Sequence, residues 1–335
     1  MKGCFVMQII QKAPDKALPE IIEFQGHKLF NSKESRTVQA HIAFSDWGLN
    51  ENTGIMLVSH NWGGTWTMCW EWCRILANKF NLICIDTDYY QSGWKTGDPT
   101  YDLGVIQTMD CLRAFYEVRK YLIENNLPFN RRRNYASGAS GGGDISQMVN
   151  KFAPHTFGCI IDLCGTPGLT DDIAYGVGRL NAGYSQDPQA ENYLAKHMQE
   201  IRDFGNPEHL KIQYACNPDN QVVIVHGVDD DYCSCADKAK IFANMLQAGF
   251  KPEGYFITPG MVDGLIVTGT GHTLGDRAFI IAKYGQKFIA EQGAMAKLVA
   301  ADDIERQSKI VYPVTGGSYC IDFSQGSPEI TFIEK

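Results

Sequence analysis

Short apolar runs alternate with amphipathic stretches along most of the chain from residue 54 onward. Runs typical of strands buried on both faces occur at 55–59 and 82–86, and further strands are predicted at 134–137, 157–163, 222–226 and near 255–258. Apolar residues at helical spacing predict helices at 65–80, 105–123, 141–152, 235–246 and 276–290. Parallel strands need crossover connections, which helices supply, so the pattern predicts an α/β protein with a mostly parallel central sheet flanked by helices.

Three parts of the chain depart from this alternation. Residues 37–44 (TVQAHIAF) alternate apolar and polar positions, so we expect residues 1–53 to supply antiparallel strands at one edge of the sheet. Residues 168–220 are polar and rich in Asn, Asp and Gln, which predicts a lid-like insertion over the site. The tail at 300–335 is predicted to be a small extension with a hairpin around Gly316-Gly317. We expect the whole chain, 1–335, to form one elaborated domain.

Composition narrows the possible partners. The chain has 335 residues, of which 44% are hydrophobic, and this content is typical of a globular protein. Its net charge of -8 argues against nucleic acid or an anionic membrane as partner, because both need a basic face. No apolar run approaches the length of a membrane span. A homo-oligomer is compatible with the sequence, which does not fix the oligomeric state.

The 11 cysteines indicate a reducing compartment. Their number is odd, and most of them stand within apolar stretches, where a free cysteine behaves as a small buried hydrophobe. The first residues, MKGCFVMQIIQKAPDK, make a poor signal peptide because Gln8 and Gln11 interrupt the apolar run. We therefore expect a cytoplasmic protein.

A glycine-rich turn stands where the strand predicted at 134–137 meets the helix predicted at 141–152. It reads Gly138-Ala139-Ser140-Gly141-Gly142, a Gly-x-Ser-x-Gly pattern. Such a turn lifts the serine hydroxyl to a helix N-terminus, where backbone N–H groups stabilise an oxyanion. A structural glycine turn is the alternative. A phosphate cradle is disfavoured, because no lysine follows and the Gly-x-Gly-x-x-Gly spacing is absent.

This element resembles the nucleophile elbow of the α/β-hydrolase family, with Ser140 in the nucleophile position. The strand predicted at 55–59 ends in His60-Asn61-Trp62-Gly63-Gly64, similar to the family segment that supplies the second oxyanion donor. The resemblance implies that the backbone N–H groups of Trp62 and Gly141 form the oxyanion hole. Asn61 replaces the usual glycine.

The same resemblance implies a triad acid and base in the expected chain order. The strand predicted at 222–226 leads into Asp229-Asp230-Asp231, and the family position of the acid is Asp230, with its two neighbours as competitors. His272, in a glycine-rich loop before the last helix, occupies the position of the general base. The three acids could also bind a cation, but no other ligand set with metal spacing is visible, and no metal is predicted.

The implied reaction is acyl transfer to Ser140, hydrolysis of the acyl-enzyme by water, and no cofactor. The chain looks like the esterase, dienelactone-hydrolase-like and prolyl-oligopeptidase-like branch. Tyr89 and Tyr90 either form an aromatic substrate wall with Trp62, suited to a sugar or an aromatic acyl group, or hold their loop together. The leading hypothesis is a serine carboxylesterase acting on small or carbohydrate-linked esters. A prolyl-oligopeptidase-like peptidase and a non-catalytic binding or scaffold protein with this fold are the alternatives.

Overall fold

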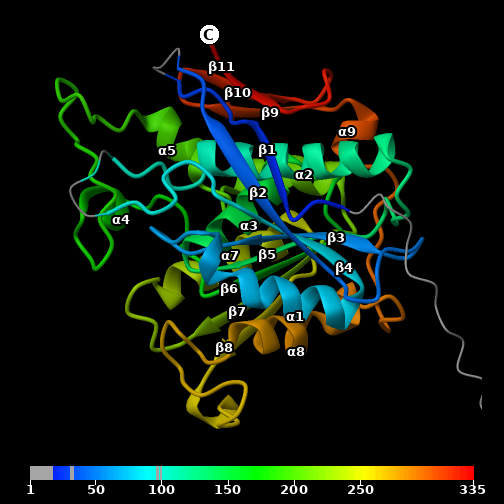
Figure 1. Ribbon diagram of the computed structural model, residues 1–335. Coiled ribbons are helices and arrows are strands. Elements are labelled where there is room, and N and C mark those ends of the chain that lie inside the picture. The colour runs from blue at the N-terminus through cyan, green and yellow to red at the C-terminus, as the bar shows by residue number, and fades with distance from the viewer. Residues whose placement is uncertain (1–17, 31–33, 96–97, 99) are drawn as a thin grey trace, which may run out of the picture.

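The computed structural model describes residues 18–30, 34–95, 98 and 100–335 (Figure 1). The segment 1–17, on which the signal-peptide argument rested, lies outside the described residues. Among the described residues, no helix combines the length and the apolar composition needed to cross a membrane.

A mixed, mostly parallel sheet forms the centre of the described chain. Its strands are β1 (Ile21–Gln25), β2 (Thr37–Phe44), β3 (Gly54–Ser59), β4 (Leu82–Thr87), β5 (Asn134–Ala139), β6 (Cys159–Leu163), β7 (Gln221–Gly227) and β8 (Glu253–Ile257). They lie in the order β1-β2-β4-β3-β5-β6-β7-β8. The pairs from β4 to β8 are parallel, whereas β1 pairs with β2 and β2 with β4 in antiparallel fashion. The predicted fold class and its antiparallel N-terminal edge are confirmed.

Helices cover both faces of this sheet (Figure 1). The helices are α1 (Trp70–Phe80), α2 (Ile106–Glu124), α3 (Gly141–Phe152), α4 (Asp171–Tyr175), α5 (Lys196–Arg202), α6 (Pro207–Cys216), α7 (Cys235–Ala248), α8 (Arg277–Ile289) and α9 (Asp303–Arg306), with 3-10 turns η1 (Trp66–Met68) and η2 (Pro259–Met261). Apolar side chains of α1 and α8 share one core cluster with the sheet. Those of α2, α3, α6 and α7 share the cluster on the opposite face.

The helix predicted at 65–80 is divided in two. The chain forms η1, passes through Cys69, and only then enters α1. Two contacts hold the first turn in place: the Trp66 ring stacks on His41, with ring centroids 4.1 Å apart, and the Trp66 N–H donates to the Asp88 carboxylate at 3.1 Å. These tertiary contacts belong to β2 and to the loop after β4, so helical periodicity alone did not reveal the break.

The polar stretch 168–220 contains α4, α5 and α6. Leu210 of α6 and Ile201 of α5 belong to the main core. The earlier part of the stretch forms a separate small cluster with residues from the loop before α2, among them Ile173, Leu194 and Tyr101. Within this stretch, the earlier part has a core separate from the main one, and its role as a lid stays a prediction.

The C-terminal tail forms a second, antiparallel sheet. Its strands are β9 (Lys309–Val314), β10 (Gly317–Asp322) and β11 (Glu329–Glu334), and β9 and β10 form the hairpin predicted around Gly316-Gly317. The small sheet lies beside α2 (Figure 1), where Arg113 donates to Pro328 and pairs with Glu329. The tail therefore covers the helical layer rather than extending the central sheet.

Candidate active site

Ser140 occupies the tight turn between β5 and α3. Its backbone has φ 58 and ψ -124, a sparsely populated conformation that costs of order 1–3 kcal/mol in a non-glycine residue. Two hydrogen bonds hold the turn: the Ser140 N–H donates to the Leu163 carbonyl at 3.0 Å, and the Ser140 carbonyl accepts from the Thr166 N–H at 3.1 Å. A strained serine at the start of a helix is the geometry that the elbow motif requires.

The glycines around Ser140 allow the helix to approach the sheet. A Cβ on Gly142 would lie 2.0 Å from the Ser59 carbonyl oxygen, and a Cβ on Gly138 would lie 2.2 Å from the Gly142 carbonyl oxygen. No side chain fits in either place, because both atoms it would meet are backbone. The Gly-x-Ser-x-Gly pattern is therefore a packing requirement of the β5–α3 turn as well as a chemical signature.

Asp230 and His272 meet across the loops that follow β7 and β8. The Nδ1 atom of His272 lies 2.8 Å from Asp230 Oδ2. The other oxygen, Oδ1, accepts hydrogen bonds from the N–H groups of Tyr232 and Cys233, both at 2.9 Å. Burial would raise the pKa of Asp230, but the hydrogen bonds from His272 and Cys233 outweigh it and hold that pKa below its ordinary value. The carboxylate is therefore charged and fixed in orientation against the imidazole.

The two acids beside Asp230 make other contacts. Asp229 accepts a 2.6 Å hydrogen bond from the Thr270 hydroxyl. Asp231 forms a 2.7 Å ion pair with Arg179, which belongs to the insertion. Of the three candidate acids, Asp230 is the one whose carboxylate contacts His272.

The segment after β3 lies against the start of α3. A Cβ on Gly141 would be 2.8 Å from the Trp62 nitrogen, so the two predicted oxyanion donors come from adjacent backbone. Neither N–H donates to an acceptor among the described residues. The Trp62 ring stacks on Tyr101, with centroids 4.1 Å apart, and so belongs to the aromatic cluster under the insertion.

Tyr89 is buried, and its contacts stabilise the loop after β4. Its hydroxyl donates to the His60 carbonyl at 2.6 Å, and its ring stacks on the His60 ring with centroids 4.0 Å apart. Burial lowers the pKa of His60 to about 4, so this imidazole is neutral. Tyr90 lies under the Arg36 guanidinium, 5.0 Å from it. These contacts fit the loop-holding interpretation, and both tyrosines also line a cavity of about 430 Å³, so the aromatic wall stays a prediction.

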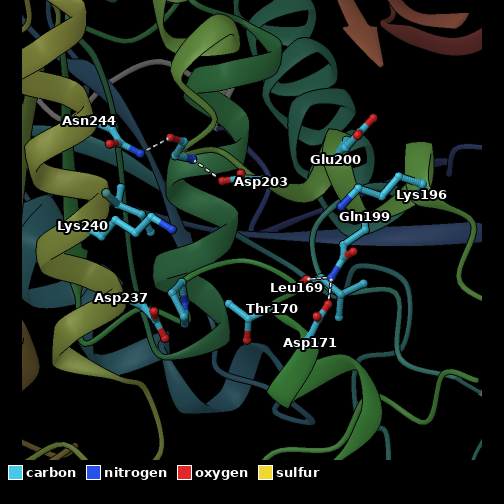
Figure 2. A pocket seen from close by; sticks show the side chains of 13 residues that line it. Leu169, Thr170, Asp171, Lys196, Gln199, Glu200, Asp203, Asp237, Lys240 and Asn244 are labelled. Atoms are coloured by element: carbon cyan, nitrogen blue, oxygen red, sulfur yellow. Dashed lines mark hydrogen bonds between the residues drawn. The ribbon is translucent and has the colours of Figure 1, made fainter. Parts of the chain in front are cut away.

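Two cavities adjoin the insertion. One, of about 420 Å³, lies between the insertion and the loop after β7, and Asp230, Tyr232 and Arg179 are among its lining residues. The other, of about 230 Å³, lies between α5 and α7, and Figure 2 shows Lys240 and Gln199 on opposite sides of it. Of the three candidate triad residues, Asp230 is the one that lines the first cavity.

Sequence reasoning missed three side chains near Asp230. The Tyr232 ring lies 5.1 Å from the His272 ring, and the Arg179 guanidinium lies 4.9 Å from the Tyr232 ring. The sulfur of Cys164 lies within 4.8 Å of ligand atoms of both Asp230 and His272. Cys164 directly follows β6, as Ser140 follows β5, so its place at the carboxyl edge of the sheet was the signal that could have identified it.

The chain is similar to known hydrolases in sequence and in structure. The model of the prolyl oligopeptidase family matches residues 107–275, just over half of the chain. No curated protein sequence matches. An acylaminoacyl peptidase from Pyrococcus horikoshii is similar in structure, with a TM-score of 0.55 and 12% identity over 80% of this chain and 41% of that one. An acylaminoacyl peptidase in complex with Z-Gly-Gly-Phe-chloromethyl ketone has a TM-score of 0.52 and 11% identity, over 82% and 39%. The chain spans about two fifths of the length of these proteins, and the likeness shows the shared fold.

Proposed function

The chain belongs to the prolyl oligopeptidase family and is a serine hydrolase of the α/β-hydrolase type, and from that premise we propose that it is a carboxylesterase acting on small or carbohydrate-linked esters. Ser140 is the nucleophile, His272 the general base and Asp230 the acid that orients it. The observation that carries the proposal is the 2.8 Å contact between His272 Nδ1 and the buried Asp230 carboxylate. This contact leaves Nε2 of His272 as the nitrogen that exchanges a proton with Ser140.

The reaction follows from these roles. His272 removes the hydroxyl proton as Ser140 Oγ attacks the ester carbonyl carbon, and the carbonyl oxygen becomes an oxyanion. The N–H groups of Trp62 and Gly141 donate to that oxyanion. The tetrahedral intermediate collapses, the C–O bond to the leaving alcohol breaks, and His272 returns the proton to the alcohol. Water, deprotonated by His272, then releases the acid from Ser140. No cofactor takes part.

The surroundings of Asp230 support a small, polar substrate. The adjoining cavity measures about 420 Å³, and charged side chains of Arg179, Asp231 and Asp237 line it. A polar cavity disfavours the long acyl chains that a lipase accepts. The family match and the acylaminoacyl peptidases of similar fold support the second candidate, a serine peptidase.

We also propose a cellular location and a partner for the protein. The ten described cysteines are all free, which supports a reducing compartment, and we place the protein in the cytoplasm. Its proposed partner is a small-molecule ester, with no nucleic acid or membrane involved.

A substrate panel tests the function. Wild type, Ser140→Ala and Ser146→Ala are assayed with nitrophenyl acetate and butyrate, an acetylated sugar and a prolyl anilide. Ser146 is the matched control, since it is a buried serine on α3 whose hydroxyl donates to the Gly143 carbonyl at 2.7 Å. We expect ester hydrolysis by wild type and by Ser146→Ala, and its loss in Ser140→Ala. Faster cleavage of the anilide than of every ester would instead establish the peptidase. A folded wild type that neither hydrolyses any substrate nor reacts with a fluorophosphonate at Ser140 would leave the scaffold alternative.

A further inference from the structure

Three metal-binding atoms of different chemical types meet at the carboxyl edge of the sheet. They are the sulfur of Cys164, a carboxylate oxygen of Asp230 and a ring nitrogen of His272, and they all lie within 4.8 Å of one another. They come from the loops that follow β6, β7 and β8. We propose that these three side chains form an inhibitory site for a thiophilic divalent cation, of which Zn²⁺ is the representative.

The donor set selects the cation. Thiolate and imidazole together are ligands that Zn²⁺ prefers, whereas Mg²⁺ and Ca²⁺ take oxygen ligands. Three protein ligands with water in the fourth position complete a tetrahedral Zn²⁺ site. On binding, the Cys164 thiol loses its proton to solvent as the sulfur–metal bond forms. The imidazole coordinates through the lone pair of a nitrogen that holds no proton.

The distances require only a small adjustment. Ligand atoms around a tetrahedral Zn²⁺ lie roughly 3.5 Å apart, given metal–ligand lengths of about 2.0 to 2.3 Å. The Asp230–His272 contact of 2.8 Å must therefore widen, while the Cys164 sulfur already lies within 4.8 Å of both atoms. The His272 loop is anchored on the loop after β7, because a Cβ on Gly227 would lie 2.1 Å from the Thr270 carbonyl oxygen, and that oxygen accepts from the Asp229 N–H at 2.9 Å. The adjustment is therefore expected of the His272 and Cys164 side chains. The Asp230 carboxylate is already fixed by two backbone N–H groups.

The charge at the site changes when a cation binds. The thiolate and the Asp230 carboxylate supply two negative charges to a bound metal. Arg277, which interacts electrostatically with both Cys164 and Asp230, supplies one positive charge against them. The two negative charges therefore act on the metal only after it has displaced the thiol proton.

Binding at this place removes the base from the reaction. His272 cannot accept the Ser140 proton while its nitrogen or its Asp230 partner is held by a metal. The consequence for activity rests on the proposed function, whereas the binding itself does not. Under the proposed function, a bound cation would therefore inhibit the enzyme.

Metal binding is tested directly with Co²⁺ on the full chain carrying Ser140→Ala, which retains all three ligands. A thiolate–cobalt charge-transfer absorption is expected on titration, together with its displacement by Zn²⁺. Adding Cys164→Ser should remove the absorption, whereas adding Cys320→Ser should not, because Cys320 lies in β10 of the C-terminal sheet. Absorption that survives Cys164→Ser, or none in the parent, overturns the proposal. Cys164→Ala, with a cooperative thermal unfolding transition as the check of folding, replaces Cys164→Ser if the latter does not fold.

The inhibitory effect is measured as the Zn²⁺ concentration that halves ester hydrolysis. We expect this concentration to rise at least tenfold in Cys164→Ala relative to wild type and to Cys320→Ser, with each rate normalised to its own metal-free value. A chelator should restore the wild-type rate, and Mg²⁺ should not inhibit. Equal midpoints in all three proteins contradict the proposal. If wild type hydrolyses nothing, the proposed function fails, while the cobalt titration still decides the metal site.

Discussion

The backbone nitrogen of Trp62 lies directly beside the Cα of Gly141, so that a Cβ at position 141 would be 2.8 Å from it. Because the atom in the way is backbone, a side chain here must move the segment after β3. In the proposed mechanism both N–H groups must converge on one oxygen. The absence of a side chain at position 141 is therefore a condition for forming the oxyanion hole.

Gly141→Ala should lower kcat for ester hydrolysis by about 10²-fold, the order expected when one oxyanion donor is displaced. KM should change little, because the donors act mainly on the transition state. Gly260→Ala is the matched control, since a Cβ there meets no atom within 4 Å. Steady-state kinetics of the two variants check the prediction, and equal kcat values would contradict it.

Asp230→Asn should lower kcat by about 10⁴-fold while the protein stays folded. An amide in place of the carboxylate no longer stabilises the imidazolium or selects the tautomer of His272. Asp229→Asn and Asp231→Asn are the matched controls. In the wild type, the Asp229 carboxylate contacts Thr270 and the Asp231 carboxylate contacts Arg179, and neither contacts His272. The kcat of each variant is measured at a single pH, and its thermal unfolding midpoint checks that it is folded. If Asp231→Asn lost more activity than Asp230→Asn, the assignment of the acid would be wrong.

Much of the fold was predictable because its signals are local. The strand predicted at 37–44 and the helix predicted at 141–152 match β2 and α3 in both bounds. The apolar runs that form β3 to β7 are buried along their whole length, and a run of that kind needs no tertiary information to be recognised, whereas the edge strand β8 is only partly buried. The break at Cys69 depends on contacts with His41 and Asp88, which lie far from it in sequence, and the local pattern did not contain it.

The candidate site was predictable only in part, because some of its residues are identified by contacts between distant segments of the chain. Ser140 and His272 stand in glycine-rich segments that signal a special backbone. The choice of Asp230 among three adjacent acids required the positions of His272, Thr270 and Arg179 in space. Cys164 stands in an apolar stretch, where its sequence environment is that of an ordinary core cysteine.

Lys238→Met should reduce the free energy of unfolding by about 3–5 kcal/mol. The Lys238 amine and the Asp162 carboxylate form a fully buried pair with Nζ and Oδ2 2.8 Å apart, and removing the amine leaves a buried charge without its counterion. Lys309→Met is the control, because Lys309 pairs with Asp322 at the surface and such pairs are screened by water. Urea unfolding of both variants makes the comparison, and similar losses in the two would refute the expected difference.

Lys151 should make the stability depend on pH on the alkaline side of neutrality. Its amine is buried on α3, where it donates to the Ile201 and Asp203 carbonyls at 2.6 and 2.9 Å, and burial lowers its pKa to about 7. In the unfolded chain the amine has the ordinary lysine pKa, near 10.4. Between these two values the unfolded state holds a proton that the folded state lacks, so the free energy of unfolding rises with pH in this window.

Lys151→Met removes that proton linkage and isolates its contribution. The two unpaired carbonyls destabilise the variant by an amount that does not depend on pH. The difference in unfolding free energy between wild type and variant should therefore grow by about 2 kcal/mol from pH 7 to pH 9, in favour of wild type. Urea unfolding at several pH values gives this difference, in which titrations common to both proteins cancel. A difference that stays constant with pH would mean that the folded protein keeps Lys151 charged throughout the window.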